Sequence, residues 1–120
     1  MIRLKNTREI DGIRRSGRLL ARALAALAAQ VHEGATTRDL DAFVHSWLTA
    51  RGGRPAFLGY MDFPASVCIS VNAEVIHGIP GARKIREGDL VSLDLGVDLD
   101  GYFSDAAVTV AVVPFISQMP

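Results

Sequence analysis

The sequence predicts an α+β domain in which two helices pack on an antiparallel sheet. In the N-terminal part of the 120 residues, apolar side chains repeat at helical spacing, and further along they follow the spacing of strands. An Asp100-Gly101 pair is a strong signal for a two-residue hairpin turn. Helices followed by strands that are joined through turns are typical of the α+β class.

The first helix is expected over residues 7–32. Thr7 is the expected N-cap, with Glu9 in the first turn, and Gly34 is the expected stop signal. A coiled coil would use the same apolar stripe, but a helix docked on a sheet suits this short, alanine-rich seam better. The stripe advances in steps of three and four through Ile10, Ile13, Gly17, Leu20, Leu24, Leu27 and Val31.

The second helix is expected to begin near Thr37 and to end at Gly52-Gly53. Thr36 and Asp39 have the spacing of a capping box. Its expected apolar face consists of Leu40, Phe43, Val44, Trp47 and Leu48. Beyond the two glycines the apolar period becomes extended, and strands are expected over 56–58, 67–71, 90–98 and 102–113.

Composition limits the classes of function. Thirteen basic and thirteen acidic side chains cancel, so no net charge draws the chain to nucleic acid or to a membrane. The alanine- and leucine-rich run at 19–29 is interrupted by Arg22 and is too short to cross a bilayer. Cys68 is the single cysteine, which excludes an intrachain disulfide and suits the reducing cytoplasm, where we expect the protein.

The hairpin is the most informative part of the chain because its turn fixes a register. That register pairs Leu99 with Tyr102, Gly96 with Asp105, and Asp94 with Ala107. Side chains alternate between faces, so Asp94 and Asp105 become diagonal neighbours on one face, about 7–8 Å apart at the backbone. Gly96 leaves room between them. We expect Leu93, Leu95 and Val97 to point the other way, towards the helices.

Two interpretations of the aspartates remain open at this point. Asp94 and Asp105 could converge on a hard or borderline divalent cation, or both could be solvated on an exposed face. Asp89, Asp98 and Asp100 flank turns and are expected to be solvated.

Histidine and cysteine give weaker signals. His77 precedes a turn enforced by Gly78 and Pro80, and by itself it could be an ordinary packed or surface histidine. Cys68 lies in an apolar strand and is expected to be a small core residue rather than a nucleophile. His32 and His45 are expected to be structural or solvated.

Three segments together resemble type I methionine aminopeptidase. They are KNTREIDGIRRSGRLLA at 5–21, LGYMDFPASVCISVNAEVIHGIPG at 58–81 and EGDLVSLDLGVDLDGYFSDAA at 87–107. The resemblance implies the pita-bread (creatinase/aminopeptidase) fold, in which a dinuclear metal centre lies between two α+β halves. It also implies removal of N-terminal methionine from nascent proteins or peptides by a metal-activated water. The expected cofactors are divalent ions (Co, Mn, Fe or Zn), two per complete site.

The resemblance also assigns roles to residues. Asp94 and Asp105 match the two aspartate ligands, and His77 matches the histidine that contacts substrate near the scissile bond. Positions lining the methionine pocket are matched by Tyr60, Phe63, Cys68 and Phe57, the last of which stands where a smaller residue can occur. The family's remaining ligands, one histidine and two glutamates, and its second catalytic histidine belong to the C-terminal half.

We therefore expect residues 1–113 to form the N-terminal half of such a catalytic domain. Residues 114–120, PFISQMP, do not continue the family pattern and are interpreted as a truncation, a changed reading frame or an engineered end. Three hypotheses follow: an aminopeptidase carrying part of the metal site, with little activity alone; a half-fold that homodimerises through its sheet, or joins a complementing C-terminal half, and binds divalent metal; and a non-catalytic peptide-binding module.

Overall fold

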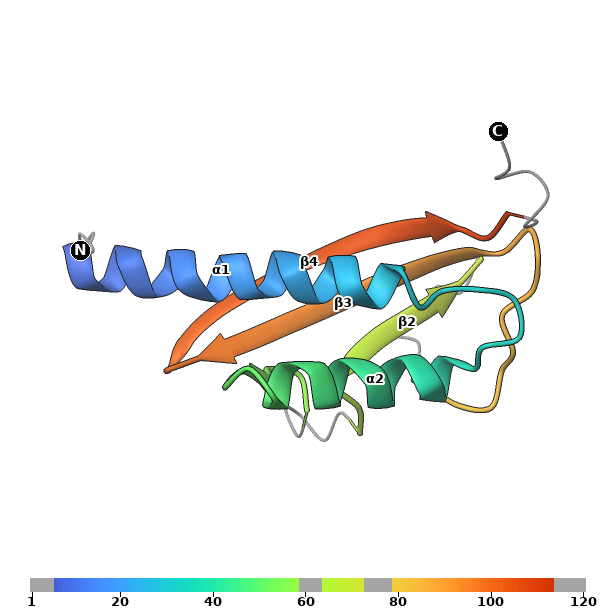
Figure 1. Ribbon diagram of the computed structural model, residues 1–120, viewed down its shortest axis with the longest axis horizontal. Helices are drawn as coiled ribbons and strands as arrows, with labels where there is room; N and C mark the ends of the chain where they lie inside the picture. Colours follow the sequence, from blue (N-terminus) through green and yellow to red (C-terminus); the bar gives the residue numbers. More distant parts are fainter. Residues whose placement is uncertain (1–5, 59–63, 73–78, 114–120) are drawn as a thin grey trace.

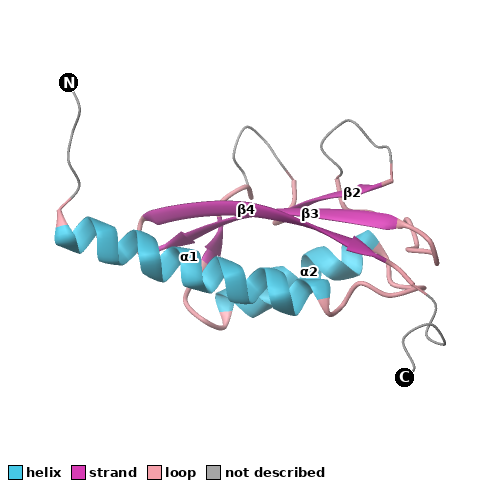
Figure 2. Cartoon of the chain, turned by 90° about the horizontal axis from the view of Figure 1, so that it is seen from above, coloured by secondary structure: helices cyan, strands magenta, loops and turns pink. Residues whose placement is uncertain are grey.

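Two helices lie on one face of a four-stranded antiparallel sheet (Figure 1). The computed structural model describes residues 6–58, 64–72 and 79–113. Figure 2 shows both helices on the same side of the sheet. The helices are α1 (Thr7–Ala28) and α2 (Thr37–Thr49), and the strands are β1 (Arg54–Pro55), β2 (Val67–Val71), β3 (Leu90–Leu99) and β4 (Tyr102–Ala111).

Helix α1 begins and ends at positions that differ from the prediction. Its N-cap is Asn6 rather than Thr7, and the Asn6 side chain accepts a hydrogen bond from the backbone N–H of Glu9 at 2.8 Å. The helix ends at Ala28, not residue 32, because the N–H groups of Gln30 and Val31 bond three residues back and the chain turns away. Gly34 then donates to the carbonyl of Ile85, which fixes this exit.

Leu20, Leu24 and Leu27 of the expected stripe pack on the sheet, which confirms docking over the coiled-coil alternative. The start of the stripe was wrong, because Ile10 is 40% exposed while Leu19 and Ala23 are buried. The predicted capping box of α2 is also present. Thr36 Oγ1 accepts from the N–H of Asp39 at 3.1 Å, and the Asp39 carboxylate accepts from the N–H of Thr36 at 3.2 Å. Beyond α2, Gly52 has a φ of 80°, the left-handed conformation that a glycine adopts at little cost.

Strand β3 is the centre of the sheet. Strand β4 pairs along its whole length on one edge, and β2 and β1 pair with successive parts of the other edge. The predicted hairpin register is confirmed at all three expected pairs, Leu99 with Tyr102, Gly96 with Asp105 and Asp94 with Ala107.

Three strands differ from their predicted bounds. Strand β3 ends at Leu99, one residue later than predicted. The first strand is Arg54–Pro55 instead of 56–58, because the chain bends out of the sheet once the N–H of Ala56 has donated to the carbonyl of Gly96. Strand β4 stops at Ala111 instead of 113, because Val112 exchanges backbone hydrogen bonds with the loop before β3.

The core lies between the sheet and the two helices. Val91, Leu93, Leu95 and Val97 are fully buried there, as expected, together with apolar residues of both helices. Because side chains alternate along β3, this packing turns Ser92, Asp94 and Gly96 to the opposite face of the sheet. The face that carries the aspartates is therefore fixed by the burial of the leucines and valines between them.

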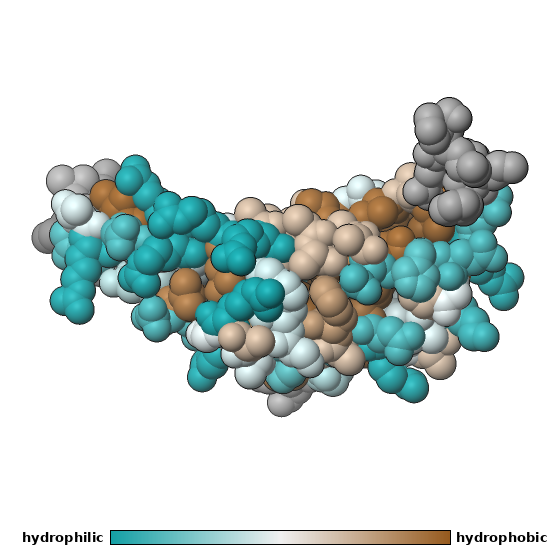
Figure 3. All heavy atoms as spheres, in the orientation of Figure 1, coloured by the Kyte–Doolittle hydropathy of each residue, from teal (hydrophilic) through white to brown (hydrophobic). Residues whose placement is uncertain are grey.

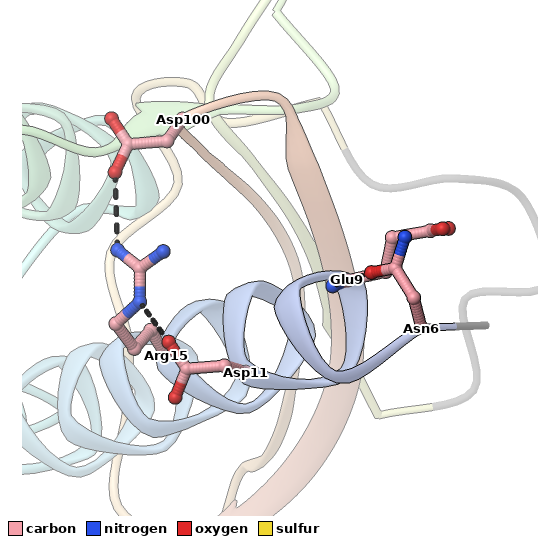
Figure 4. A network of polar contacts seen from close by, with 5 residues as sticks. All are labelled: Asn6, Glu9, Asp11, Arg15 and Asp100. Atoms are coloured by element: carbon pink, nitrogen blue, oxygen red, sulfur yellow. Dashed lines mark hydrogen bonds and ion pairs between the residues drawn. The ribbon is translucent and has the colours of Figure 1, made fainter.

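Polar contacts join α1 to the hairpin. Arg15 bonds Asp11 at 3.2 Å within the helix and reaches Asp100 in the hairpin turn at 3.3 Å (Figure 4). Hydrogen bonds to Asp11 and then to Asp100 raise the pKa of Arg15. Deeper in, the hydroxyl of Ser16 lies 2.8 Å from that of Ser104. Exposed ion pairs add little stability, so these contacts mainly orient the helix on the hairpin.

Two glycines of α1 provide a matched test of this packing. A Cβ at Gly12 would fall on the ring of Tyr102, whereas a Cβ at Gly17 would meet no atom within 4 Å. We expect Gly12→Ala to lower the free energy of unfolding by about 1–3 kcal/mol through overpacking. Gly17→Ala is expected to raise it by about 0.5–1 kcal/mol because alanine favours the helix. Urea denaturation of both variants checks this; equal effects would contradict the packing of α1 on Tyr102.

Candidate metal and substrate site

Asp94 and Asp105 lie on the face of the sheet that the helices leave uncovered. Asp94 sits at the middle of β3 and is half-buried, while Asp105 on β4 is exposed. Asp105 pairs with Gly96, two residues along from Asp94, so the two aspartates are diagonal neighbours. That relation corresponds to about 7–8 Å between backbones. Two carboxylates at this separation can approach a common cation.

Cys68 of β2 lies beside this pair. It is directly opposite Asp94 in the register, is 7% exposed and forms no disulfide. Its burial agrees with the expected small core residue, but its register position assigns it to the aspartate face rather than to the helix face. A second row on the same face carries hydroxyls, where Ser92 lies 3.0 Å from Thr109.

A shallow hollow of about 290 Å³ adjoins Asp105, and Phe57 and Phe103 contribute its aromatic surface. Phe57 packs so closely over Gly96 that an added Cβ there would lie 2.9 Å from its ring. Gly96 therefore makes room for Phe57, whose ring occupies part of the space expected between the aspartates. Phe103 is 64% exposed and was missed from the sequence. Its position two residues before Asp105 on a strand was the available signal.

Helix α2 anchors the start of β2. One oxygen of Asp41 accepts hydrogen bonds from the N–H groups of Ser66 at 2.7 Å and Val67 at 3.0 Å. His45 is exposed, as expected, and its Nδ1 lies 3.0 Å from the Ser66 hydroxyl. These contacts hold the strand that brings Cys68 next to Asp94. No local pattern pointed to Asp41, because its partners lie 25 and 26 residues away.

His77, Tyr60 and Phe63 lie outside the described residues. The end of β2 and the start of β3 are tied together by side-chain hydrogen bonds. Asn72 accepts from the N–H of Leu90 at 2.9 Å, and its amide donates to Asp89 at 3.0 Å. Asp89 and Asp98, expected to be solvated, are in fact hydrogen-bonded, Asp98 to Arg54 and to the N–H of Gly101.

The hydrogen bonds that Asp89 accepts should make the stability of the fold depend on pH. Hydrogen bonds from the N–H of Arg86 and then from Asn72 lower the pKa of Asp89 below its ordinary value. A lowered folded pKa adds stability above the unfolded pKa of about 3.9, and that stability is lost as pH falls through the folded pKa. We therefore expect Asp89→Asn to lower the melting temperature at pH 7. Between pH 5 and pH 3, the melting temperature of this variant should fall less than that of the unsubstituted chain. Thermal melts across that window check this; parallel curves would contradict it.

The chemistry of the donor set suits an oxygen-preferring divalent ion, since Asp94 and Asp105 share a face of the sheet as diagonal neighbours. Across the described ranges 6–58, 64–72 and 79–113, no three His, Cys, Asp or Glu side chains gather as a metal-binding group. Within these ranges the candidate donor set therefore consists of the two carboxylates of Asp94 and Asp105. No helix in the described part of the chain is long and apolar enough to cross a membrane.

Comparison with known proteins identifies what this arrangement is similar to. The model of metallopeptidase family M24 matches residues 11–119. Methionine aminopeptidases of Treponema pallidum and Clostridium perfringens are 52% and 48% identical over 112 residues, which is 93% of this chain but 44% and 45% of theirs. The crystal structure of methionine aminopeptidase from Rickettsia prowazekii superposes with a TM-score of 0.90 at 33% identity, covering 95% of this chain and 46% of that one.

The chain therefore spans a little under half the length of these relatives. The observed helices and sheet, together with the superposition, confirm the predicted fold class: α+β, corresponding to about half of a pita-bread fold.

Proposed function

Because this chain belongs to metallopeptidase family M24, we propose that its residues 1–113 form the N-terminal half of a catalytic domain that removes N-terminal methionine from nascent proteins or peptides. The observation that carries this proposal is the hairpin register, which brings Asp94 and Asp105 together on the uncovered face of the sheet. The identity to methionine aminopeptidases over 112 residues supports the choice of substrate.

In this proposal the carboxylates of Asp94 and Asp105 hold divalent ions, Co, Mn, Fe or Zn, two per complete site. Such ions polarise a carbonyl and lower the pKa of bound water. The remaining ligands come from a C-terminal half, either on the same chain or as a separate partner. Because the ligand set within this chain is partial, we expect weak turnover from the 120 residues alone.

The chain's own residues receive and orient the substrate. Cys68 and Phe57 line the pocket for the methionine side chain together with Tyr60 and Phe63, and an apolar lining displaces water from that side chain. Phe103 extends the apolar wall next to Asp105. His77 contacts the substrate near the scissile bond.

The direct experiment is an assay for methionine released from a Met-Gly peptide by the full chain, with and without Mn²⁺ or Co²⁺. A Leu-Gly peptide of the same length is the control for the side-chain pocket. We expect release of methionine that requires metal, stops with a chelator and exceeds release of leucine. Methionine peptide that binds with no metal-dependent release would favour the peptide-binding module instead.

An alternative is a half-fold that pairs with a second copy through its sheet and binds divalent metal with weak peptidase activity. The observation in its favour is the outer edge of β4, since this strand pairs only with β3 among the described strands. A shallow apolar groove of about 490 Å³ runs between that strand and α1, where its lining includes Gly17, Ala21, Ala25 and Ala28. Sedimentation distinguishes the cases: a strict monomer of 12.9 kDa would exclude this alternative.

A further inference from the structure

The charges of this chain cancel in number but are separated in space. Helix α1 carries five arginines against two acidic residues, whereas the sequence after Arg86 contains six acidic residues and no lysine or arginine. On the helical face shown in Figure 3, hydrophilic side chains gather over the N-terminal part of α1 at the left, and apolar side chains lie nearer the centre. Although the net charge of the chain is zero, helix α1 therefore carries an excess of positive charge.

Three of these arginines form a row with a fourth arginine that follows α2. Arg14, Arg18 and Arg22 follow at intervals of four residues along α1 and are all exposed. Arg51, at the end of α2, continues the row across Trp47: the guanidinium carbons of Arg51 and Arg22 lie 3.9 Å and 5.8 Å from the centre of its ring. We call these four residues the arginine row.

The positive charge of the arginine row is not compensated locally. Within the described part of the chain, no carboxylate lies within ion-pair distance of any of the four, while the neighbouring Arg15 and Arg54 are both paired. Arg51 is also held in place, because it donates to the carbonyl of Trp47 at 3.0 Å while it stacks on the ring. A row of guanidinium groups that no neighbouring carboxylate neutralises is suited to a partner with repeated negative charge.

We propose that the arginine row binds the phosphate backbone of a nucleic acid. The three arginines of α1 repeat about every 6 Å along a straight helix, so they can meet successive phosphates of one strand. Each guanidinium can hold a phosphate through two parallel hydrogen bonds. The row lies on the helical layer, away from the sheet face of Asp94 and Asp105, so this surface is separate from the proposed catalytic site.

A membrane surface fits the same charge less well. Helices that lie in a membrane interface present large apolar side chains beside their basic ones. In α1 the leucines face the sheet: Leu20, Leu24 and Leu27 are at most 6% exposed. The arginine row therefore offers charge and planar donors, while Trp47, the large apolar side chain within it, is half-buried and covered by two guanidinium groups.

The test is titration of a fluorescein-labelled 20-bp DNA duplex with the full chain at about 50 to 200 mM KCl. Binding through four arginines predicts a slope of log K against log salt of about −3 to −4, at about −0.9 per phosphate. Arg18→Gln combined with Arg22→Gln and Arg51→Gln is expected to reduce the slope to about −1 and to weaken binding at least tenfold at about 50 mM. Arg18→Gln alone, at a side chain that forms no ion pair or hydrogen bond within the described part of the chain, is expected to reduce the slope by about 0.9.

A triple substitution of the loop before β3, Arg83→Gln with Lys84→Gln and Arg86→Gln, makes the same change in charge elsewhere and is expected to keep the slope. Trp47, the single tryptophan, lies within the row, so its fluorescence should change on binding. Asp94→Asn should leave binding unchanged, which separates this result from the proposed peptidase. Three results would overturn the proposal: no binding at about 50 mM salt, equal losses in both triple variants, or binding to phosphatidylserine vesicles but not to the duplex.

Discussion

Asp94→Asn is expected to reduce metal-dependent release of methionine at least about 100-fold. Substitution of residues that only hydrogen-bond to a metal ligand already lowers metal affinity or activity by about 10–100-fold, and loss of a ligand should cost at least as much. Asparagine keeps the shape of the side chain but removes the negative charge that holds a divalent ion. The position is suited to this role because Asp94 is half-buried between Cys68 on β2 and Ala107 on β4. The measurement is the rate of methionine release from a Met-Gly peptide at saturating Mn²⁺.

Asp100→Asn is the matched control. It makes the same change of charge in the same hairpin, but at the turn, where the Asp100 side chain is 66% exposed and pairs with Arg15. Asparagine tolerates the positive φ of 54° found there. We expect this variant to keep its rate. A loss of rate that is similar in both variants would show that the effect comes from overall charge and not from a ligand at Asp94.

Leu95→Ala is expected to lower the free energy of unfolding by about 3–5 kcal/mol. Leu95 is fully buried at the centre of β3, between the sheet and the helices, so shortening it removes apolar contacts and leaves a cavity. A domain of this size has a total stability of about 5–15 kcal/mol, so the variant should be near the limit of folding at 37 °C. Urea denaturation followed by far-ultraviolet circular dichroism gives the difference.

Leu90→Ala provides the comparison within the same strand. Leu90 is 52% exposed, so its replacement creates little cavity and should cost less than about 1 kcal/mol. If both substitutions lowered the free energy of unfolding equally, the result would contradict the packing of the inward face of β3 against the helices. Such a result would also remove the reason why Asp94 and Gly96 point to the opposite face.

The hairpin could be predicted from the sequence because its determinants are local. The Asp100-Gly101 turn fixes the register, and the alternation of side chains then assigns Asp94 and Asp105 to one face. The capping box of Thr36 and Asp39 was equally readable, since both partners lie within one turn of helix.

Features that depend on distant partners could not be read in the same way. The early end of α1 is fixed by the bond from Gly34 to Ile85, and the anchoring of β2 depends on Asp41 of α2. The first strand was placed too late because Arg54 and Pro55 lack the apolar alternation of a strand, yet they pair with β3. The sequence alone did not distinguish Asn6 from Thr7 as the N-cap, because the two residues are adjacent and both types can cap a helix.

The most direct measurement is a titration of the chain with Mn²⁺, followed by electron paramagnetic resonance of the free ion. The unsubstituted chain and Asp100→Asn are predicted to remove Mn²⁺ from solution with the same affinity, and Asp94→Asn and Asp105→Asn are each predicted to weaken that affinity at least about tenfold. Unchanged affinity in a chain carrying both Asp94→Asn and Asp105→Asn would contradict the assignment of this carboxylate pair as a metal site.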